Sequence, residues 1–285
     1  MALIIGIKKS VKTALRPSWR FAKSKVSSIL GKDTLSVAEH AKLLKSTLVS
    51  KAGRTGDVKF IPYGKSDIFI AVTEPQVSAP LQDRVIKGSY EAAECRMCEK
   101  VLEANEVVVE LGAGLGLIST VVMKSGKAKE VHCFEADQRL LGLIQATHKK
   151  NGVLNSFLYN AAVTGEKEAL AKGEMTFHLR ENFWGNSTNP NVGKTPEFAV
   201  QVQTRSLKSI MVSIKPTIII ADIEGAELGL FTDVDLSGVK RILLEMHPFA
   251  IGAKGMRSVF DDLHKAGFYY DPRFSSGAVS GFSRG

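Results

Sequence analysis

Long apolar runs are missing from this sequence of 285 residues, and none approaches the ~18 residues that a membrane-spanning helix needs. The opening segment, residues 1–7, is apolar but short, and its lysines follow it, whereas a secretory signal peptide carries them in front. Both observations argue against a membrane-spanning or secreted protein. We therefore expect a cytoplasmic location.

Cysteine is also scarce, with three residues in the chain. Cys95 and Cys98 form a C-x-x-C pair inside a predicted helix over residues 92–102, whereas a redox pair needs a helix N-terminus to lower a thiol pKa. A zinc site needs about four ligands, and only His132 and Cys133 are available to join the pair. The sequence thus predicts buried, reduced thiols, and neither a disulfide framework nor a zinc centre.

Negative charge is sparse at the start of the chain. Residues 1–65 contain 14 lysines and arginines against three acidic residues, a net charge of +11, so the remainder of the chain carries −2. Within residues 1–21, apolar side chains recur at helical spacing among basic residues. Either residues 1–30 contact an anionic surface or a membrane, which would make the protein peripheral there, or this apolar stripe packs on the protein. We favour the packing interpretation.

The most informative segment is a glycine-rich loop after a predicted strand over residues 107–111. The loop reads Glu110-Leu-Gly112-Ala-Gly114-Leu-Gly116, so its third glycine comes one residue earlier than in the G-x-G-x-x-G fingerprint of dinucleotide-binding proteins. Glycines let a ligand approach the backbone closely. A carboxylate at the start of the loop disfavours a phosphate, because like charges would meet in a partly dry site. It suits a cationic ligand, and the loop therefore predicts S-adenosylmethionine (SAM) in preference to NAD.

Glu135 ends the next predicted strand, where a carboxylate can accept hydrogen bonds from both hydroxyls of a ribose. Under this interpretation Glu110 and Gly112 hold the methionine end of SAM. Asn160 and Ala161 lie by its adenine. The residues predicted to bind the cofactor are Glu110, Gly112, Ala113, Gly114, Gly116, Glu135, Ala136, Asn160, Ala161 and Asp222.

Predicted strands and helices alternate along the chain, which indicates an α/β fold with a doubly wound, mostly parallel sheet. Residues 86–285 are predicted to form this domain, and residues 1–85 a basic extension with two helices and a pair of short strands. The strands predicted for the sheet cover residues 107–111, 131–134, 157–162, 218–222, 241–245 and 268–270. A further strand pair covers residues 175–179 and 198–203. Helices are predicted over residues 92–102, 117–123, 139–151 and 256–266.

A second polar group follows two later strands. Asp222-Ile-Glu224-Gly-Ala-Glu227 places three carboxylates after a run of four apolar residues, and His247 follows the next strand. Because parallel strands end at the same edge of a sheet, these side chains should lie near the glycine loop. Asp222, Glu224 and His247 are predicted as catalytic residues, one of them taking a proton, and Glu227 is expected to cap or start the next helix. A divalent ion between Asp222, Glu245 and His247 is left open as an alternative, and no metal ligand is assigned.

Together, these two groups resemble the FkbM-type methyltransferases, a SAM-dependent family with the Rossmann-like, seven-stranded class I methyltransferase fold. The most distinctive match is the segment from Asp222 to Glu227. The other matching segments are Glu110-Leu-Gly-Ala-Gly-Leu-Gly116, Phe134-Glu-Ala136, Asn151-Gly152, Ala161-Ala-Val163, Thr204-Arg-Ser-Leu207 and Leu244-Glu-Met-His247. Glu110 and Gly114 depart from the Asp and Asn usual in the family, and Ala136 departs from its Pro.

The resemblance implies an enzyme that methylates a hydroxyl group on a sugar, a glycan or a secondary metabolite and releases S-adenosylhomocysteine. A nucleic-acid methyltransferase is one alternative, since the basic N-terminal segment could contact phosphates. Asp222 and Glu224 argue against it, because they would repel a phosphate backbone. A non-catalytic module that docks through residues 1–30 is the other. The expected partner is thus a small-molecule or glycan acceptor and not nucleic acid, and no oligomeric state is predicted.

Overall fold

The computed structural model describes residues 57–180, 183 and 198–285. The two helices expected within residues 1–56, and with them any surface contact by residues 1–30, lie outside these ranges. Among the described residues, no helix is both long enough and apolar enough to cross a membrane.

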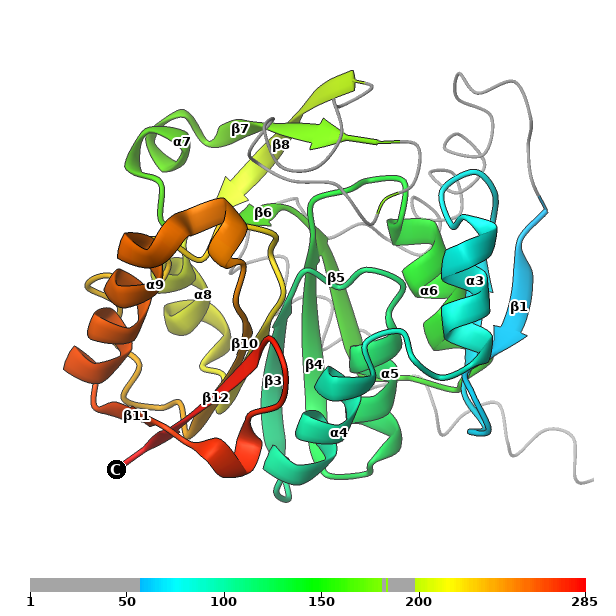
Figure 1. Ribbon diagram of the computed structural model, residues 1–285, viewed down its shortest axis with the longest axis horizontal. Helices are drawn as coiled ribbons and strands as arrows, with labels where there is room; N and C mark the ends of the chain where they lie inside the picture. The colour runs from blue at the N-terminus through cyan, green and yellow to red at the C-terminus, as the bar shows by residue number, and fades with distance from the viewer. Residues whose placement is uncertain (1–56, 181–182, 184–197) are drawn as a thin grey trace, which may run out of the picture.

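A seven-stranded sheet forms the centre of the molecule, in the strand order β11-β12-β10-β9-β3-β4-β5 (Figure 1). The strands from β10 to β5 run parallel, and β12 pairs antiparallel with both β10 and β11. The predicted doubly wound, mostly parallel sheet is therefore confirmed. The strands are β3 Glu106–Leu111, β4 Ala128–Glu135, β5 Ser156–Asn160, β9 Ile218–Ala221, β10 Arg241–Glu245, β11 Phe268–Tyr270 and β12 Val279–Arg284.

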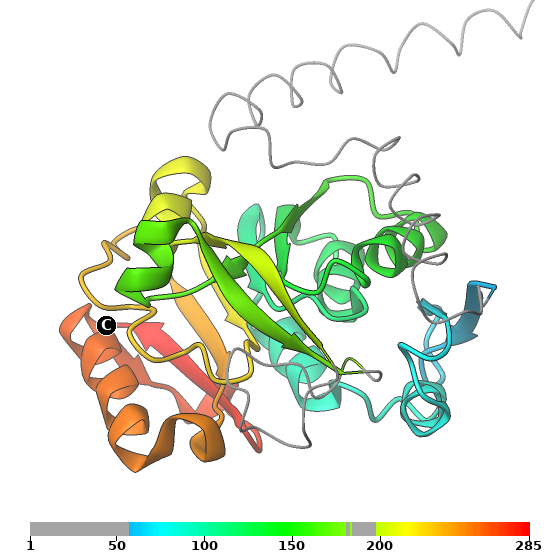
Figure 2. The same cartoon turned by 90° about the horizontal axis from the view of Figure 1, so that it is seen from above.

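Helices cover both faces of this sheet (Figures 1 and 2). On one side lie α3 (Ala79–Ile86), α4 (Ala92–Val101), α5 (Leu117–Lys124) and α6 (Leu141–Lys150), and on the other α8 (Leu207–Ile214) and α9 (Pro248–Lys265). Successive strand residues point to opposite faces, so Val108 packs with the first set of helices and Val109 with the second. All of β9 is buried, as expected for a parallel strand that is covered on both faces.

The helices at residues 92–102, 117–123 and 139–151 are confirmed as α4, α5 and α6 to within two residues at each end. The last predicted helix begins earlier, because Pro248 starts a first turn and Gly252 (φ 66°, ψ 175°) kinks the chain before the second part of α9. The sequence does not predict α3, α8 or β12. Each is short, and β12 contains Ser and Gly where an apolar alternation would identify a strand.

The predicted pair of short strands is also confirmed, as the antiparallel hairpin of β1 (Lys59–Pro62) and β2 (Phe69–Val72). Its second strand is bound to α6. The side chain of Asn151 accepts a hydrogen bond from the Phe69 amide at 2.9 Å, and that of Thr147 accepts one from the Ala71 amide at 3.0 Å. The hairpin and α3 share the hydrophobic core under α4 and α5. The domain boundary at residue 85 stays a prediction.

A small sheet with the strand order β6-β8-β7 lies across the carboxyl ends of the parallel strands (Figure 1). The strands are β6 Ala162–Val163, β7 Glu174–Leu179 and β8 Phe198–Arg205, and the short helix α7 (Lys167–Lys172) joins the first two. The predicted antiparallel pair is confirmed as β7 and β8. The strand predicted over residues 157–162 is divided in the structure, because the chain leaves the main sheet after Asn160 and pairs with β8.

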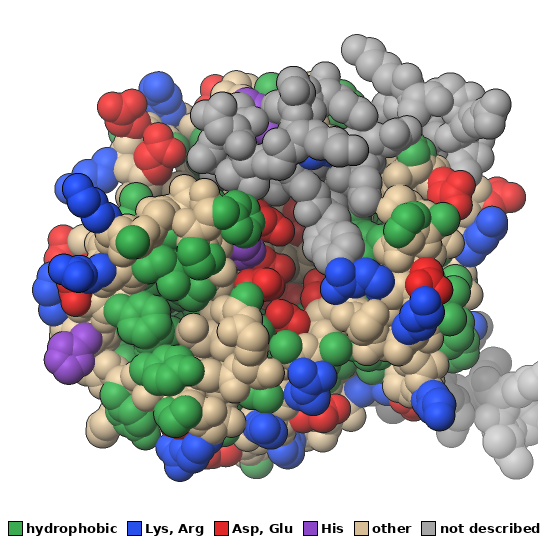
Figure 3. Space-filling model, in the orientation of Figure 1, with side chains coloured by type: hydrophobic (Ala, Val, Ile, Leu, Met, Phe, Trp, Pro, Cys, Tyr) green, Lys and Arg blue, Asp and Glu red, His purple; other side chains and the backbone are tan. Residues whose placement is uncertain are grey.

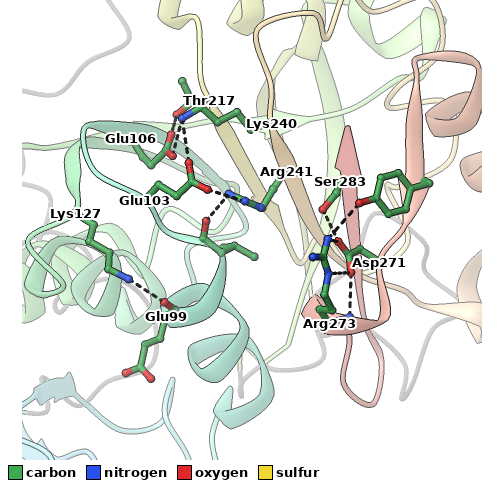
Figure 4. A network of polar contacts seen from close by, with 12 residues as sticks. Glu99, Glu103, Glu106, Lys127, Thr217, Lys240, Arg241, Asp271, Arg273 and Ser283 are labelled. Carbon is green, nitrogen blue, oxygen red and sulfur yellow. Dashed lines mark hydrogen bonds and ion pairs between the residues drawn. The ribbon is translucent and has the colours of Figure 1, made fainter. Parts of the chain in front are cut away.

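Charged side chains connect the amino ends of three strands (Figure 4). Glu106 of β3 is fully buried, and it accepts hydrogen bonds from Lys240 Nζ at 3.0 Å and from the Thr217 hydroxyl. Glu103 pairs with Arg241 at 2.7 Å. Because Thr217 precedes β9 and Lys240 precedes β10, these contacts fix the two strands against β3.

The glycine loop leaves β3 through Gly112, which lies against the end of β9. Gly112 has a φ of +81°, and a Cβ atom there would lie 1.8 Å from the carbonyl oxygen of Asp222. The Asp222 amide donates to the Leu111 carbonyl at 2.9 Å, and the Gly112 amide donates to the Phe134 carbonyl at 2.9 Å. The loop is thus held between the ends of β9 and β4, where a side chain does not fit.

Gly112→Ala should therefore destabilise the fold strongly, because its methyl group would meet a backbone carbonyl within the sheet. We expect a loss of about 3 kcal/mol or more in the free energy of unfolding, of which ~1–2 kcal/mol comes from the left-handed backbone alone. Gly126→Ala is the matched control, since Gly126 has a similar φ of +69° but no atom within 4 Å of its Cβ position. Thermal unfolding measures both, and equal shifts in Tm would contradict the role of the Asp222 contact.

Candidate functional site

A cavity that is partly open to solvent lies where β3, β4 and β9 end. The predicted residues that line it are Gly112, Gly114, Glu135, Ala136, Ala161, Asp222 and Glu224. The predicted residues that do not line it are Glu110, Ala113, Gly116, Asn160 and His247. The remaining wall is mainly apolar and includes Phe177 of β7, so the small sheet contributes to the site.

Two glycines of the loop present backbone to the cavity. The amide of Gly114 donates to Glu135 Oε2 at 2.9 Å, which joins the loop to the end of β4. A Cβ atom on Gly114 would lie 2.9 Å from the hydroxyl of Tyr90. Ala113 is buried below this surface, and Gly116 adopts a φ of 75° as the residue before α5. Gly112 and Gly114 are therefore the glycines of the loop that face the cavity, while its other members shape the turn.

Glu135 lies at the end of β4 with 7% of its surface exposed, and both of its oxygens accept backbone hydrogen bonds. Oε2 is bound by the Gly114 amide, and Oε1 by the Asp137 amide at 2.7 Å. Burial and the charge of Asp137 raise the pKa of Glu135 to about 7, although these amides oppose the rise. Each carboxylate oxygen still has a free lone pair, so the carboxylate can accept two hydroxyl groups.

Beside Glu135, the wall becomes apolar. Phe134, Leu140 and Val163 line the cavity here, together with Ala161. Asn160 does not reach the cavity, because its Nδ2 donates to the backbone carbonyls of Glu135 at 2.9 Å and Ala136 at 3.1 Å. Asn160 thus holds the turn after β4 in place. Where Asn160 was predicted to contact an adenine, the cavity is lined by the apolar side chains named above.

Glu110 points away from the cavity. Its Oε1 accepts a hydrogen bond from the Ser119 amide in α5 at 3.3 Å, and its Oε2 has no hydrogen-bond partner among the described residues. The side chain is 2% exposed. Burial raises the pKa of Glu110 to about 7, although contacts with Cys133 and Ser119 oppose the rise. Since Glu110 and Cys133 are register partners in β3 and β4, both face the core beneath α5.

Tyr90 and Glu91 also line the cavity, although no motif in the sequence identifies them. Glu91 has a φ of 47°, unusual for a residue other than glycine, and it turns the chain into α4. Its Oε2 is buried and accepts no hydrogen bond from the described residues. Burial raises the pKa of Glu91 well above its usual value, and the charges of Asp222 and Glu110 add to the rise. The carboxylate that faces the glycine loop is thus Glu91 and not Glu110.

The second predicted group assembles around His247, whose side chain is 6% exposed. His247 Nδ1 lies 2.7 Å from Glu227 Oε1. Nε2 faces the other way, 3.4 Å from Asp222 Oδ1 and 3.5 Å from Glu224 Oε2. The structure therefore brings all three predicted catalytic residues together, two in the cavity wall and His247 directly behind them.

The prediction that Glu227 caps or starts a helix is wrong. The chain from Glu224 to Thr232 forms successive turns, and Glu224 itself has a φ of 50°. Glu227 is completely buried, where its Oε1 also accepts the Gly225 amide at 3.1 Å. A helix start would expose this carboxylate to solvent, whereas the contact with His247 draws it inward. Glu227 thus orients the imidazole ring.

Acidic side chains gather in a hollow next to a histidine on this face of the molecule (Figure 3). Burial raises the pKa of Asp222 well above its usual value, and the charges of Glu245 and Glu224 add to the rise. Burial also raises the pKa values of Glu224 and Glu245. For His247, burial lowers the pKa, but the contact with Glu227 and the nearby carboxylates outweigh it and raise the pKa to about 9. The group therefore attracts protons or other cations at neutral pH.

Replacing Glu110 by Gln should make stability less dependent on pH. The native pKa of Glu110, about 7, lies above the value of 4.5 for a free glutamate, so its contribution to stability is complete below pH 4.5 and is lost as the pH rises through 7. Gln keeps the shape without the charge. We expect Glu110→Gln to gain up to about 3 kcal/mol relative to the wild type between pH 5 and pH 8.

The measurement is Tm as a function of pH for both proteins. Glu106→Gln is the matched control on the same strand, because Glu106 is equally buried but has Lys240 as a cationic partner. The Glu106→Gln variant should be less stable than the wild type at both pH 5 and pH 8. A Tm difference between Glu110→Gln and the wild type that is the same at pH 5 and pH 8 would contradict the prediction.

Several solved structures share a remote likeness with this chain. A precorrin-6y C5,15-methyltransferase from Geobacter metallireducens GS-15 has 13% identity and a TM-score of 0.40, over 75% of this chain and 91% of that one. TYW2 from M. jannaschii, solved in complex with AdoMet, has 13% identity and a TM-score of 0.43, over 80% and 88%. An rRNA methylase from Streptococcus thermophilus has 12% identity and a TM-score of 0.38, over 67% and 93%. Likenesses this remote carry no argument about function, and no curated protein matches the sequence.

A family model gives the decisive comparison. The model described as the methyltransferase FkbM domain matches residues 110–270, more than half of the chain. The match begins at the glycine loop and includes both Glu135 and the segment from Asp222 to Glu227. The resemblance predicted from the sequence is therefore confirmed, and the protein belongs to the FkbM methyltransferase family.

Proposed function

We propose that the protein transfers the methyl group of SAM to a hydroxyl group of a small molecule or glycan. Membership of the FkbM family makes it a SAM-dependent methyltransferase, and the hydroxyl acceptor is our inference. The observation that carries it is a single cavity whose wall contains both the glycine loop and the carboxyl groups of Asp222 and Glu224. A hydroxyl acceptor needs such a group, because its proton has to leave.

Each part of SAM has a chemical counterpart in the cavity wall. Glu135 suits the ribose, since its two oxygens keep lone pairs for the hydroxyls. The apolar surface of Phe134 and Leu140 suits the adenine ring. Glu91 suits the cationic methionine end, in place of the predicted Glu110. Transfer of a sulfonium charge to a site rich in buried carboxyl groups is favourable, because opposite charges attract strongly away from water.

Methyl transfer from a sulfonium is an in-line displacement. The acceptor oxygen bonds to the methyl carbon while the carbon–sulfur pair passes to sulfur, and the hydroxyl proton leaves to a base. Carboxyl groups with raised pKa values, such as Asp222 and Glu224, are stronger bases than ordinary carboxylates. His247 holds these groups in place from behind, because its pKa of about 9 keeps the ring protonated near neutral pH. Alignment of oxygen, carbon and sulfur supplies the rest of the catalysis.

One exposed aromatic side chain beside His247 supports a ring-shaped acceptor. Phe249 is 70% exposed, and its ring meets the His247 ring edge-on with 5.6 Å between their centres. Aromatic rings in this setting bind the apolar faces of sugars and aromatic metabolites. A phosphate backbone would instead meet Glu224 and Glu245 at the same edge, which disfavours a nucleic acid.

Glu135→Ala should weaken SAM binding by about 1.5–3 kcal/mol, the scale for hydrogen bonds to a charged group. Glu168→Ala, at an exposed position of α7, is the control and should leave the affinity unchanged. Calorimetric titration with SAM and with S-adenosylhomocysteine gives both affinities. Wild-type affinity in Glu135→Ala would show that the ribose lies elsewhere.

Asp222→Asn should preserve the fold and much of the SAM affinity while lowering turnover by roughly 10² to 10⁴-fold, the usual effect of removing a catalytic base. Transfer of radiolabelled methyl from SAM to a panel of glycosides, phenolic metabolites and nucleic acids measures it. Asp261→Asn, at an exposed position of α9, is the control. Transfer to nucleic acid alone would overturn the hydroxyl acceptor, and SAM binding without transfer to any acceptor in the panel would favour a non-catalytic module.

A further inference from the structure

We propose that Asp222, Glu245 and His247 form a binding site for a divalent transition-metal ion at the edge of the cavity. One ligand atom from each residue lies within 4.8 Å of the others. Asp222 follows β9, Glu245 ends the adjacent β10, and His247 lies two residues beyond it, directly before α9. The three residues therefore lie at the carboxyl ends of neighbouring parallel strands, which are fixed by the ladder of the sheet.

The orientation of His247 is that of a metal ligand. Metal-binding histidines usually donate their second ring N–H to a carboxylate, which fixes the tautomer and directs the other nitrogen at the ion. Glu227 is completely buried and accepts from His247 Nδ1 at 2.7 Å. Nε2, on a side chain that is 6% exposed, is directed at Asp222 and forms no hydrogen bond with the described residues. This geometry leaves its lone pair available once the ring loses its proton.

The two carboxyl groups provide the second observation. Asp222 Oδ1 is buried, and among the described residues it accepts no hydrogen bond. Glu245 offers an oxygen within 4.8 Å of Asp222 in the same group, and both residues are partly buried. Among the described residues, His247 is the cationic neighbour at ion-pair distance from Asp222. Like charges this close repel each other unless a proton or a cation lies between them, and a divalent ion would neutralise both carboxylates at once.

The set of ligands indicates which ion fits. One imidazole nitrogen and two carboxylate oxygens suit Mn²⁺, Fe²⁺ or Zn²⁺, whereas Ca²⁺ takes six to eight oxygens and Mg²⁺ prefers oxygen alone. Three protein ligands also leave coordination positions free for water or substrate, as in catalytic metal sites. We therefore expect a transition metal to bind more tightly than Ca²⁺ or Mg²⁺.

Such an ion would bind the acceptor hydroxyl. This role rests on the proposed function, whereas the binding of the metal ion to the protein does not rest on it. Coordination lowers the pKa of a bound hydroxyl. The proton passes to Glu224, the oxygen lone pair forms the bond to the methyl carbon, and the carbon–sulfur pair leaves on sulfur. Because Asp222 belongs both to the metal site and to the cavity wall, the ion would lie beside the bound SAM.

The test is Mn²⁺ binding to the full chain after treatment with a chelator, measured by electron paramagnetic resonance and by calorimetry. We expect one Mn²⁺ per chain, displaced by Zn²⁺ more readily than by Mg²⁺ or Ca²⁺. Asp222→Asn and His247→Gln should weaken binding at least 100-fold, and Glu227→Gln should weaken it 10- to 100-fold through the loss of ring orientation. Glu94→Gln is the matched control, since Glu94 adds negative charge near Glu245 without being a ligand.

The outcomes separate this proposal from the proposed function. No Mn²⁺ binding by wild-type protein that still binds SAM would overturn the metal site and leave the methyltransferase intact. Equal weakening by Glu94→Gln and Asp222→Asn would also overturn it, because the ion would then respond to charge alone. Mn²⁺ binding without any SAM binding would overturn the cofactor site instead. The Tm of each variant shows whether it has folded, and Glu227→Gln keeps the test valid if His247→Gln does not fold.

Discussion

Gly112 lies so close to the carbonyl of Asp222 that a Cβ atom does not fit between them, and both halves of the site depend on this contact. It joins the glycine loop to the strand end that carries the acidic residues. The Asp222 amide reaches back to Leu111, so the two segments are bound in both directions. A methyl donor and its acceptor have to be aligned to within a fraction of an ångström for an in-line displacement. A backbone contact without a side chain between the segments is a rigid way to provide this.

Buried carboxyl groups are the second feature of this site. Glu91, Glu135 and Asp222 line one cavity, and burial raises the pKa of each. Such groups destabilise a folded protein when they are ionised and unpaired. Under the proposals above, a cationic ligand would remove this cost upon binding, so these carboxyl groups would strengthen the binding of a sulfonium or a metal ion. Neutral S-adenosylhomocysteine would gain less from them, which would favour release of the product.

Much of the fold could be predicted from the sequence, because buried parallel strands are apolar runs and the glycine loop has a recognisable spacing. The acids at the strand ends followed from the same pattern, since parallel strands end at one edge. The direction of the Glu110 side chain could not be predicted. A residue near the end of a strand can face either the cavity or the layer of helices, and the pairing with the neighbouring strand determines which of the two it faces. Tyr90 and Glu91 were missed because their contact with Gly114 depends on where α4 begins. The role of Glu227 was missed because it is a contact between segments 20 residues apart.

The chain leaves the main sheet after β5, forms the small β6-β8-β7 sheet, and returns to the main sheet at β9. It contributes Phe177 to the cavity, but within residues 57–180 and 198–285 it shares no strand pairing with the sheet that carries the glycine loop and the acidic residues. Changes of length or sequence in this excursion therefore do not shift the register of the strands below. A change in this segment can therefore reshape the part of the cavity wall that contains Phe177 and leave the glycine loop and the acidic residues in place.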